Sequence, residues 1–562
     1  MQLRYVETPP DWEEHERPKM PGSPARLEHT LLRRWAYVLV GIFVGLVGGL
    51  GNGLVTANLT AIQGQLGLTQ VEAAWLPAAY VMVNVTANLL VFKSRQQLGM
   101  RVFAEWGLGI YAVLALAHVF VEGYTMSLLV RGVSGFAGAT TTSLAVMYVM
   151  QGFPAARIPS ALIVAMNMSQ VALPLAWVLS PALVTINPWP HLYAFEAGLA
   201  LIAFASVVVL KLPRGMQIHV FESLDLLTFA LVAPAVALLC AVLAQGVNGW
   251  WLNTPWLAYA LIASIVLFTL AGILEYSRSR PLIQLRWLAN RWTLMFMLGA
   301  LLMRLLISEQ NYGAVGLLRA MGMNPEQLQP LYGVILCGMV LGIVVGACTF
   351  TEKTIFPQIL LSVALICIGG YLDLHSTSQS RPHDFFFSQF LVSCAAALFM
   401  GPLMMLGFKQ AMMQGMDHMV TFIVVFSMTQ SVGGLVGTAL LGSIQQQRAQ
   451  VYTQAIAREL PRTDAQLNQR LAQTQSSYNR YLTDPMLRQA QSSAQLVQVV
   501  KREAAVMAFN DVFRAIGAMA LSFLAWAFYN WLRLRFLAWR ARRASANTSP
   551  SPSSPPASPA AR

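Results

Sequence analysis

Fourteen long apolar segments follow one another between positions 35 and 531, and they limit the fold of this chain more than any other feature. One helix needs roughly 20 apolar residues to cross a hydrocarbon core of about 30 Å. Lipid offers the backbone no hydrogen-bond partners, so each segment must be helical. The sequence therefore predicts an all-α membrane protein. The expected spans are 35–57, 73–92, 102–121, 126–150, 160–183, 192–210, 226–245, 256–275, 293–312, 328–349, 356–373, 385–406, 419–443 and 507–531.

Positive side chains are distributed unevenly between the loops. Lys and Arg gather in the loops that follow even-numbered spans and next to the first and last spans, whereas the loops 122–125, 185–191 and 246–255 lack them. Short loops rich in Lys and Arg stay in the cytoplasm. We therefore expect a multi-pass protein with both termini cytoplasmic.

The composition argues against several other functions. Hydrophobic residues make up 56% of the chain and charged residues 11%, against about 25% charged in soluble domains. The net charge of +13 lies in loops and ends, so it indicates no nucleic-acid partner. The five cysteines lie inside apolar segments without metal-ligand spacing, and the sequence has no nucleotide-binding or hydrolase motif. We expect no enzyme activity, no cofactor and no metal.

Two polar stretches interrupt the pattern. The stretch 445–502 is rich in Gln and has apolar residues at rough helical spacing, which predicts two or three amphipathic helices on the outer side. It is either a simple connection between two spans or a docking surface for a periplasmic partner. The C-terminal residues 544–562 are rich in Ser, Pro and Ala and are expected to be disordered.

A few polar or ionisable side chains fall inside the predicted spans, where they usually face a cavity or a partner. Arg131 either binds backbone carbonyls of a neighbouring helix or faces a central cavity beside a proton-carrying carboxylate. Arg304 and Glu309 are separated by about 140° around a helix, so we expect each to have its own partner. The candidates for a substrate or proton pathway are Asn52, Arg131, Glu196, Arg304 and Glu309.

Small and cyclic residues mark places where helices approach or bend. Pro174 and Pro181 interrupt the span 160–183, where each frees a backbone carbonyl and favours a kink. We regard both as gating candidates. Gly433 and Gly437, four residues apart, predict close contact with another helix.

Five local stretches, in order along the chain, carry a resemblance to a known family. They are GLVTANLTAIQGQLG at 53–67, RGVSGFAGA at 131–139, LDLLTFALVAPAVALLCAVLAQGVNGWW at 224–251, FLVSCAAALFMGPLMML at 390–406 and SMTQSVGGLVGTALLGSIQQQRAQVY at 427–452. The chain resembles the 14-span drug:proton antiporters of the major facilitator superfamily, and among them the EmrB-type multidrug exporters.

The sequence also departs from this family's pattern. Gly51 and Asn52 stand where the family often carries an Asp in its first span. The motif between the second and third spans is reduced to Arg95, Gly99 and Arg101 and lacks its Asp; Gly99 and Arg101 are therefore further gating candidates. By analogy with the family, Glu196, Arg304 or Glu309 would take over proton coupling, or coupling would differ.

The resemblance implies two six-helix bundles with two inserted helices, and alternating access to a central cavity. The expected divisions are an N-terminal tail (1–32), a first bundle (33–214), an inserted pair (215–290), a second bundle (291–543) with a periplasmic insert (445–506), and a tail (544–562).

The implied function is efflux of small lipophilic or amphipathic compounds across a bacterial inner membrane by proton antiport. The implied partners are a periplasmic membrane-fusion adaptor and an outer-membrane channel. Two alternatives remain open. One is a dedicated exporter of one endogenous metabolite, such as a siderophore or an aromatic acid. The other is a non-transporting scaffold or receptor with decayed antiporter motifs.

Overall fold

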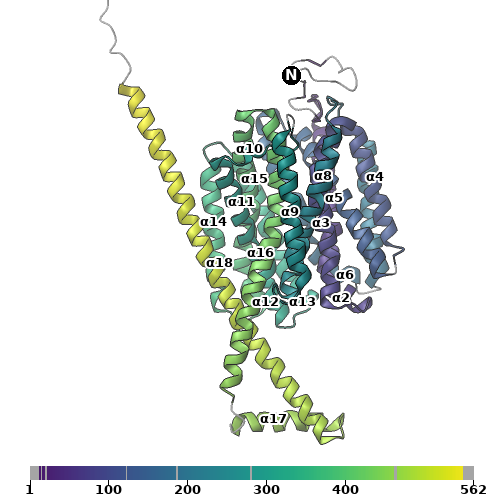
Figure 1. Ribbon diagram of the computed structural model, residues 1–562, viewed down its shortest axis with the longest axis vertical. Coiled ribbons are helices and arrows are strands. Elements are labelled where there is room, and N and C mark those ends of the chain that lie inside the picture. Colours follow the sequence, from purple (N-terminus) through teal and green to yellow (C-terminus); the bar gives the residue numbers. More distant parts are fainter. Residues whose placement is uncertain are drawn as a thin grey trace, which may run out of the picture.

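The computed structural model describes residues 12–13, 16–18, 22–121, 123–184, 188–278, 281–460 and 465–547. This part of the chain is helical apart from loops and one isolated bridge between Pro24 and Gly215 (Figure 1). Fourteen of its helices are long and apolar enough to cross a membrane. The predicted all-α class and the span count are confirmed.

The first bundle contains six of these helices and a short helix, α2 (Leu59–Gln65). Its long helices are α1 (Leu31–Ala57), α3 (Gln70–Leu98), α4 (Met100–His118), α5 (Tyr124–Gly152), α6 (Ile158–Val184) and α7 (Pro188–Val209). Helix α3 begins with a capping box, in which Thr69 accepts from the backbone of Glu72 and Glu72 accepts from the backbone of Thr69. Helix α1 packs against both α5 and α6.

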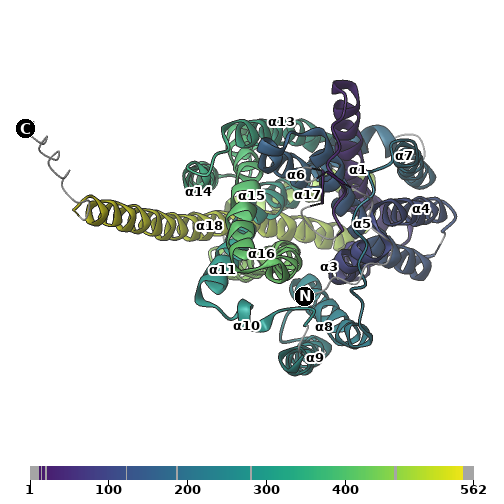
Figure 2. The same cartoon turned by 90° about the horizontal axis from the view of Figure 1, so that it is seen from above.

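Two further helices, α8 (Ser223–Gly249) and α9 (Pro255–Ser277), form the inserted pair. Seen from above, they lie beside α3 and outside the two bundles (Figure 2). Helix α8 packs against α3 of the first bundle and also touches α16 of the second. A linker with the short helix α10 (Leu285–Leu288) leads from this pair to the second bundle.

The second bundle contains the remaining six spans. Its helices are α11 (Arg291–Glu309), a π-helix (Gln310–Ala314), α12 (Val315–Ala320), α13 (Pro325–Thr349), α14 (Ile355–Leu372), α15 (Phe386–Gln414), α16 (Met416–Arg458) and α18 (Pro485–Asn547). Helix α13 packs against α15, and α14 packs against α15 and α18.

The two bundles meet mainly where α6 packs against α13, and again where α3 packs against α16. At the first contact Trp177 of α6 stacks on Tyr332 of α13, with ring centroids 4.7 Å apart. Asn167 of α6 donates to the carbonyl of Ala397 in α15 at 3.2 Å. These contacts hold together two bodies that each have their own apolar core.

The described part of the predicted amphipathic stretch forms a helical hairpin, which we define as residues 445–460 and 465–506. Its two arms are continuations of α16 and α18 rather than separate helices, and α17 (Ala465–Ser477) lies at its tip (Figure 1). Helix α18 has 63 residues, which is about 95 Å of helix. It stays helical to Asn547, four residues into the segment 544–562 that we expected to be disordered; residues 548–562 lie outside the described residues.

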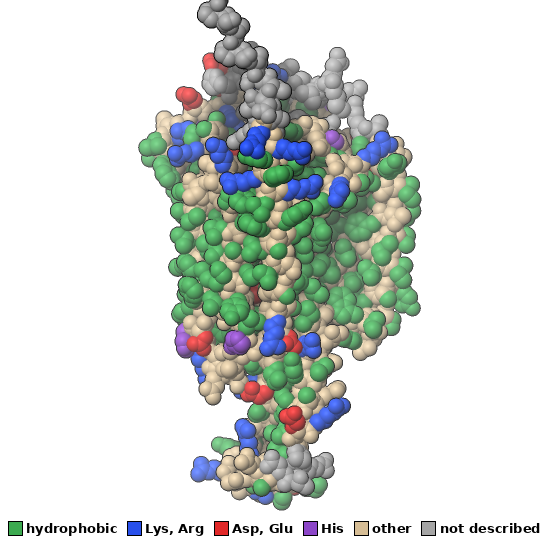
Figure 3. Space-filling model, turned by 90° about the vertical axis from the view of Figure 1, so that its left-hand side faces the viewer, with side chains coloured by type: hydrophobic (Ala, Val, Ile, Leu, Met, Phe, Trp, Pro, Cys, Tyr) green, Lys and Arg blue, Asp and Glu red, His purple; other side chains and the backbone are tan. Residues whose placement is uncertain are grey.

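The surface is divided along the long axis. Apolar side chains cover a broad middle band, and Lys and Arg gather above it, at the end where α10 and the C-terminal part of α18 lie (Figures 1 and 3). This is the end that the loop charges predict to be cytoplasmic. The opposite end carries the hairpin.

Candidate functional site

In the first bundle, Arg131 on α5 has acceptors from α1. Its guanidinium donates to the carbonyl of Gly51 at 3.0 Å and to Asn52 Oδ1 at 2.7 Å, and it lies over the ring of Tyr80 with Cζ 4.9 Å from the centroid. Arg131 is only 1% exposed. Of the two interpretations left open by the sequence, the geometry supports backbone binding, which ties α5 to α1.

Glu196 on α7 lies next to this arginine site but has a different partner. Tyr111 donates to its Oε1 at 3.4 Å. A Cβ atom at position 51 would lie 2.4 Å from the same oxygen. Glu196 therefore occupies the space that a side chain at position 51 would need, which explains why Gly stands there.

In the second bundle, Arg304 on α11 lines a small cavity of about 30 Å³ between the bundles. Pro174 of α6 lines it from the first bundle, and Gln310 and Gln430 line it from the second. Arg304 Nε donates to the carbonyl of Gln430 at 3.2 Å. In the part of the chain that the structure describes, no carboxylate forms an ion pair with Arg304.

Glu309 lies one residue before the π-helix and points to a different place. Gln389 Nε2 of α15 donates to Glu309 Oε1 and to Asp373 Oδ2, both at 3.1 Å. All three side chains are buried, and Glu309 Oε2 has no hydrogen-bond partner among the described residues. We call these three residues the carboxylate pair with its bridging amide. π-Helical turns occur frequently at functional sites.

The structure thus distributes the predicted pathway residues over three places. Asn52 and Arg131 meet, and Glu196 lies nearby. Arg304 and Glu309 have separate partners, as their spacing predicts. Asp373 and Gln389 were missed, because Asp373 lies at the end of a span and a lone Gln gives no sequence signal.

The gating candidates fall at two places. Gly99 joins α3 to α4 with φ +78°, where a Cβ would lie 2.3 Å from Gln217 Nε2. Arg101 Nε donates to the carbonyl of Leu212 at 2.8 Å, which ties this turn to the loop after α7. Pro174 and Pro181 both lie inside α6, and Pro174 lines the interbundle cavity.

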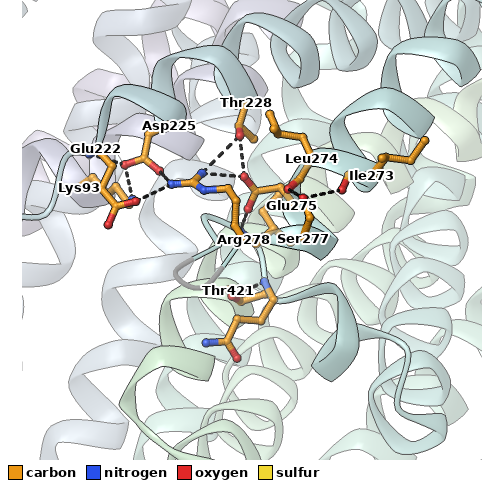
Figure 4. Close-up of polar contacts among 12 residues, drawn as sticks. Lys93, Glu222, Asp225, Thr228, Ile273, Leu274, Glu275, Ser277, Arg278 and Thr421 are labelled. Atoms are coloured by element: carbon orange, nitrogen blue, oxygen red, sulfur yellow. Dashed lines mark hydrogen bonds and ion pairs between the residues drawn. The ribbon is translucent and has the colours of Figure 1, made fainter.

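An ion-pair cluster that the sequence did not reveal joins the inserted pair to the first bundle (Figure 4). Lys93 at the end of α3 contacts Asp225 of α8 at 2.5 Å. Arg278, just after α9, contacts Asp225 at 2.9 Å, Glu222 at 3.0 Å and Glu275 at 2.8 Å. Along the sequence, Lys93 and Arg278 are simply two of the Lys and Arg side chains in the loops that follow even-numbered spans.

The linker after α9 extends this cluster towards the second bundle. Glu275 also accepts from the backbone of Ile283 at 3.1 Å, and Thr421 of α16 accepts from the backbone of Gln284 at 3.2 Å. Burial works to lower the pKa of Arg278, but its hydrogen bonds to Glu275, Asp225 and Glu222 outweigh this and raise it. Arg278 therefore stays charged, and the cluster connects all three parts of the molecule.

In the described part of the chain, no group of three or more His, Cys, Asp or Glu side chains is arranged so that it could hold a metal ion. No protein-family model matches the sequence, and no curated protein matches it. Several solved structures do match the fold of the chain. A bacterial homologue of the human drug peptide transporters PepT1 and PepT2 superposes with a TM-score of 0.56 at 12% identity, covering 90% of this chain and 99% of that chain.

Two further solved structures also superpose on the chain. Tetrameric PepTSo2 gives a TM-score of 0.53 at 13% identity, with 90% of this chain and 99% of that chain covered. The human organic anion transporter MFSD10 gives 0.51 at 13% identity, with 88% and 100% covered. The chain has the major facilitator fold. Together with the fourteen spans, this makes it a multi-pass membrane protein.

Proposed function

We propose that the protein is an inner-membrane efflux transporter that moves small lipophilic or amphipathic compounds by alternating access. The observation that carries this proposal is the interbundle cavity, which α6 lines from one bundle and α11, α13, α15 and α16 line from the other. A site at the contact between two bodies opens to one side or the other when those bodies rock. The neighbouring structures named above are transporters, which supports the same proposal.

The second part of the proposal is proton antiport, with the carboxylate pair as the proton site. Glu309 and Asp373 are 0% and 3% exposed, and none of the ion pairs in the described chain gives either of them a cation. Two negative charges that share one amide repel each other strongly in a low-dielectric interior. The arrangement therefore favours the binding of a proton, and release of that proton changes the charge beside the π-helix.

The location of the pair suits inward proton flow. Asp373 directly follows α14, at the end of the bundles opposite α10, and Gln389 links it to Glu309, which lies inside the span Arg291–Ala320. In the proposed topology, with both termini in the cytoplasm, this is the outer end. A proton from outside reaches the pair after crossing a short distance.

The test is substrate-driven proton movement in proteoliposomes that contain the purified full-length protein and a pH-sensitive dye. We expect an outward-directed substrate gradient to drive protons inward, and the dye to report this. Substrate movement without proton movement would remove the antiport part. Absence of both, across a chemically diverse panel, would favour the scaffold or receptor alternative.

The hairpin is proposed as the contact with a periplasmic membrane-fusion adaptor that leads to an outer-membrane channel. It exposes Tyr481 and Met486 (82% and 78%), together with Leu487 (54%), at and after its tip. Exposed apolar side chains on an otherwise polar element mark interaction sites. We expect the double variant Tyr481→Ala/Met486→Ala to lose an adaptor in cross-linking from cells, while Gln473→Ala on α17 keeps it. Equal capture by both variants would contradict this role.

A dedicated exporter of one endogenous metabolite is the second candidate. The observation that favours it is the unpaired Arg304 in the interbundle cavity, because a fixed charge selects its ligands more narrowly than an apolar wall does.

A further inference from the structure

The interbundle cavity contains one positive charge whose surroundings leave it without a counter-ion. Arg304 lies in the middle part of the molecule, and its one hydrogen bond in the described chain goes from Nε to a backbone carbonyl. It pairs with no carboxylate there, and Glu309 on the same helix contacts Gln389 instead. Arg304 is partly buried, and a charge withdrawn from water without a partner is costly. An anion in the cavity would remove that cost.

Two amide side chains in the same cavity also lack partners. Gln430 is 7% exposed, and both its Nε2 and its Oε1 find no hydrogen bond among the described residues. Gln310, also 7% exposed, leaves its Nε2 without an acceptor. Buried polar groups in folded proteins are nearly always paired. These amides and Arg304 together form a set of donors whose natural complement is an acceptor-rich, negatively charged group.

The other walls of the cavity are apolar. Tyr332 and Met339 of α13 and Phe399 and Met400 of α15 line it. Aromatic and thioether side chains adapt to ligands with flat or irregular apolar bodies. The cavity volume of about 30 Å³ holds little more than a water molecule. The structure therefore shows the site closed, and the bundles must separate to admit a ligand.

We infer that the transported compound is an organic anion, with a carboxylate or sulfonate held by Arg304 and the amides of Gln310 and Gln430, and an aromatic or aliphatic body against α13 and α15. This inference rests on the proposed function, since it assigns the substrate class of that same cavity. The planar guanidinium donates two parallel hydrogen bonds to a carboxylate, a geometry that a lysine does not reproduce. The charge of the ligand is thereby specified more strictly than its shape.

A matched set of probes tests the inference: 2-naphthoate, 2-naphthalenesulfonate, the neutral 2-naphthamide, the cationic 2-naphthylmethylamine, and chloride alone. The readout is the shift in unfolding temperature of the purified full-length protein in detergent. We expect naphthoate and naphthalenesulfonate to stabilise the protein and the other three to have no effect. Arg304→Gln should weaken naphthoate binding at least tenfold, and Arg304→Lys should weaken it less. The control Arg286→Gln removes an exposed arginine outside the cavity and should bind as the unmodified protein does.

Each other outcome counts against the inference. Equal stabilisation by the amide, the amine or chloride would overturn it, as would naphthoate binding that survives Arg304→Gln or the absence of any shift. A separate experiment tests the proposed function by measuring the transport of naphthoate into proteoliposomes. If naphthoate binds through Arg304 but is not transported, the proposed transport function is wrong and the anion inference stands as a binding site. If the amine and the amide are transported as well as the carboxylate, the anion inference is wrong and the transport function stands.

Discussion

Each bundle contains one arginine that the sequence places on the transport pathway, and the two have different surroundings. Arg131 in the first bundle has a backbone carbonyl, an amide oxygen and an aromatic ring around its guanidinium. Arg304 in the second bundle has one backbone carbonyl, beside amides that lack partners. Arg131 gives both of its Nη groups to acceptors on α1 and leaves only its Nε without a partner among the described residues, whereas Arg304 uses its Nε alone. This difference indicates which one serves structure and which one awaits a ligand.

The carboxylates follow the same division. Glu196 in the first bundle has the hydroxyl of Tyr111 and lies against Gly51. Glu309 in the second bundle shares the amide of Gln389 with Asp373 and keeps one oxygen free of hydrogen bonds within the described residues. Among the carboxylates, the one in the first bundle has a hydroxyl donor of its own and the two in the second share one amide, so we expect the proton chemistry to depend mainly on the second bundle.

The largest expected effect comes from removing a charge of the carboxylate pair. Glu309→Gln should reduce substrate-driven proton movement to the level of empty liposomes, because a neutral amide cannot bind and release the proton. Glu196→Gln is the matched change in the first bundle and should leave most of the proton signal. The measurement is the dye assay in proteoliposomes with equal amounts of each protein. The reverse result, with Glu196→Gln inactive and Glu309→Gln active, would invert the comparison.

The next effect separates the arginines by stability. Arg131→Met removes two charge-assisted hydrogen bonds and leaves buried acceptors unpaired, which we expect to cost about 2–4 kcal/mol. Arg304→Met removes one hydrogen bond and a partly buried charge that has no counter-ion, so its cost should stay within about 1 kcal/mol. Thermal unfolding of the purified protein in detergent measures both. Similar losses in the two variants would show that Arg304 is also structural.

A smaller effect concerns the glycines that let α16 approach α11. A Cβ at Gly437 would lie 2.3 Å from Ser308 Oγ and 3.1 Å from the backbone of Leu305. Gly437→Ala should therefore force α16 away from α11 and cost about 1–3 kcal/mol. Gly517 on α18 meets nothing within 4 Å of such an atom, so Gly517→Ala should be neutral or slightly stabilising. Unchanged unfolding temperature for Gly437→Ala would mean that the helices are less tightly packed than the structure shows.

The sequence predicted what depends on local patterns and missed what depends on pairing. Hydropathy alone located all fourteen spans, and the spacing of Arg304 and Glu309 predicted separate partners. The contact between Arg131 and Asn52 requires α1 and α5 to be neighbours, which no local pattern specifies.

The same limit explains the features that were missed. Asp373 is the last residue of a predicted span and Gln389 is neutral, so neither stands out along the chain. Lys93 and Asp225 are 132 positions apart, and only the packing of α8 on α3 shows that they meet. The helices α16 and α18 also continue beyond the membrane into the hairpin, where they pack against each other. A contact between two segments so far apart along the chain cannot be seen in a local pattern.

The smallest expected effects compare corresponding loops of the two bundles, the one between α3 and α4 and the one between α13 and α14. In the first, Arg101 donates to the carbonyl of Leu212 at 2.8 Å from a partly buried position. In the second, Lys409 contacts Glu352 at 2.8 Å, with side chains 52% and 77% exposed. Arg101→Gln should cost about 1 kcal/mol, since a carbonyl loses a charged donor. Glu352→Gln should give no measurable change, because exposed ion pairs contribute little and are screened by salt. Glu352→Gln could instead lower the unfolding temperature as much as Arg101→Gln does, with the loss disappearing at high salt. That result would show that the second bundle holds its loops by surface charge, and the contrast between the bundles would then apply only to their interiors.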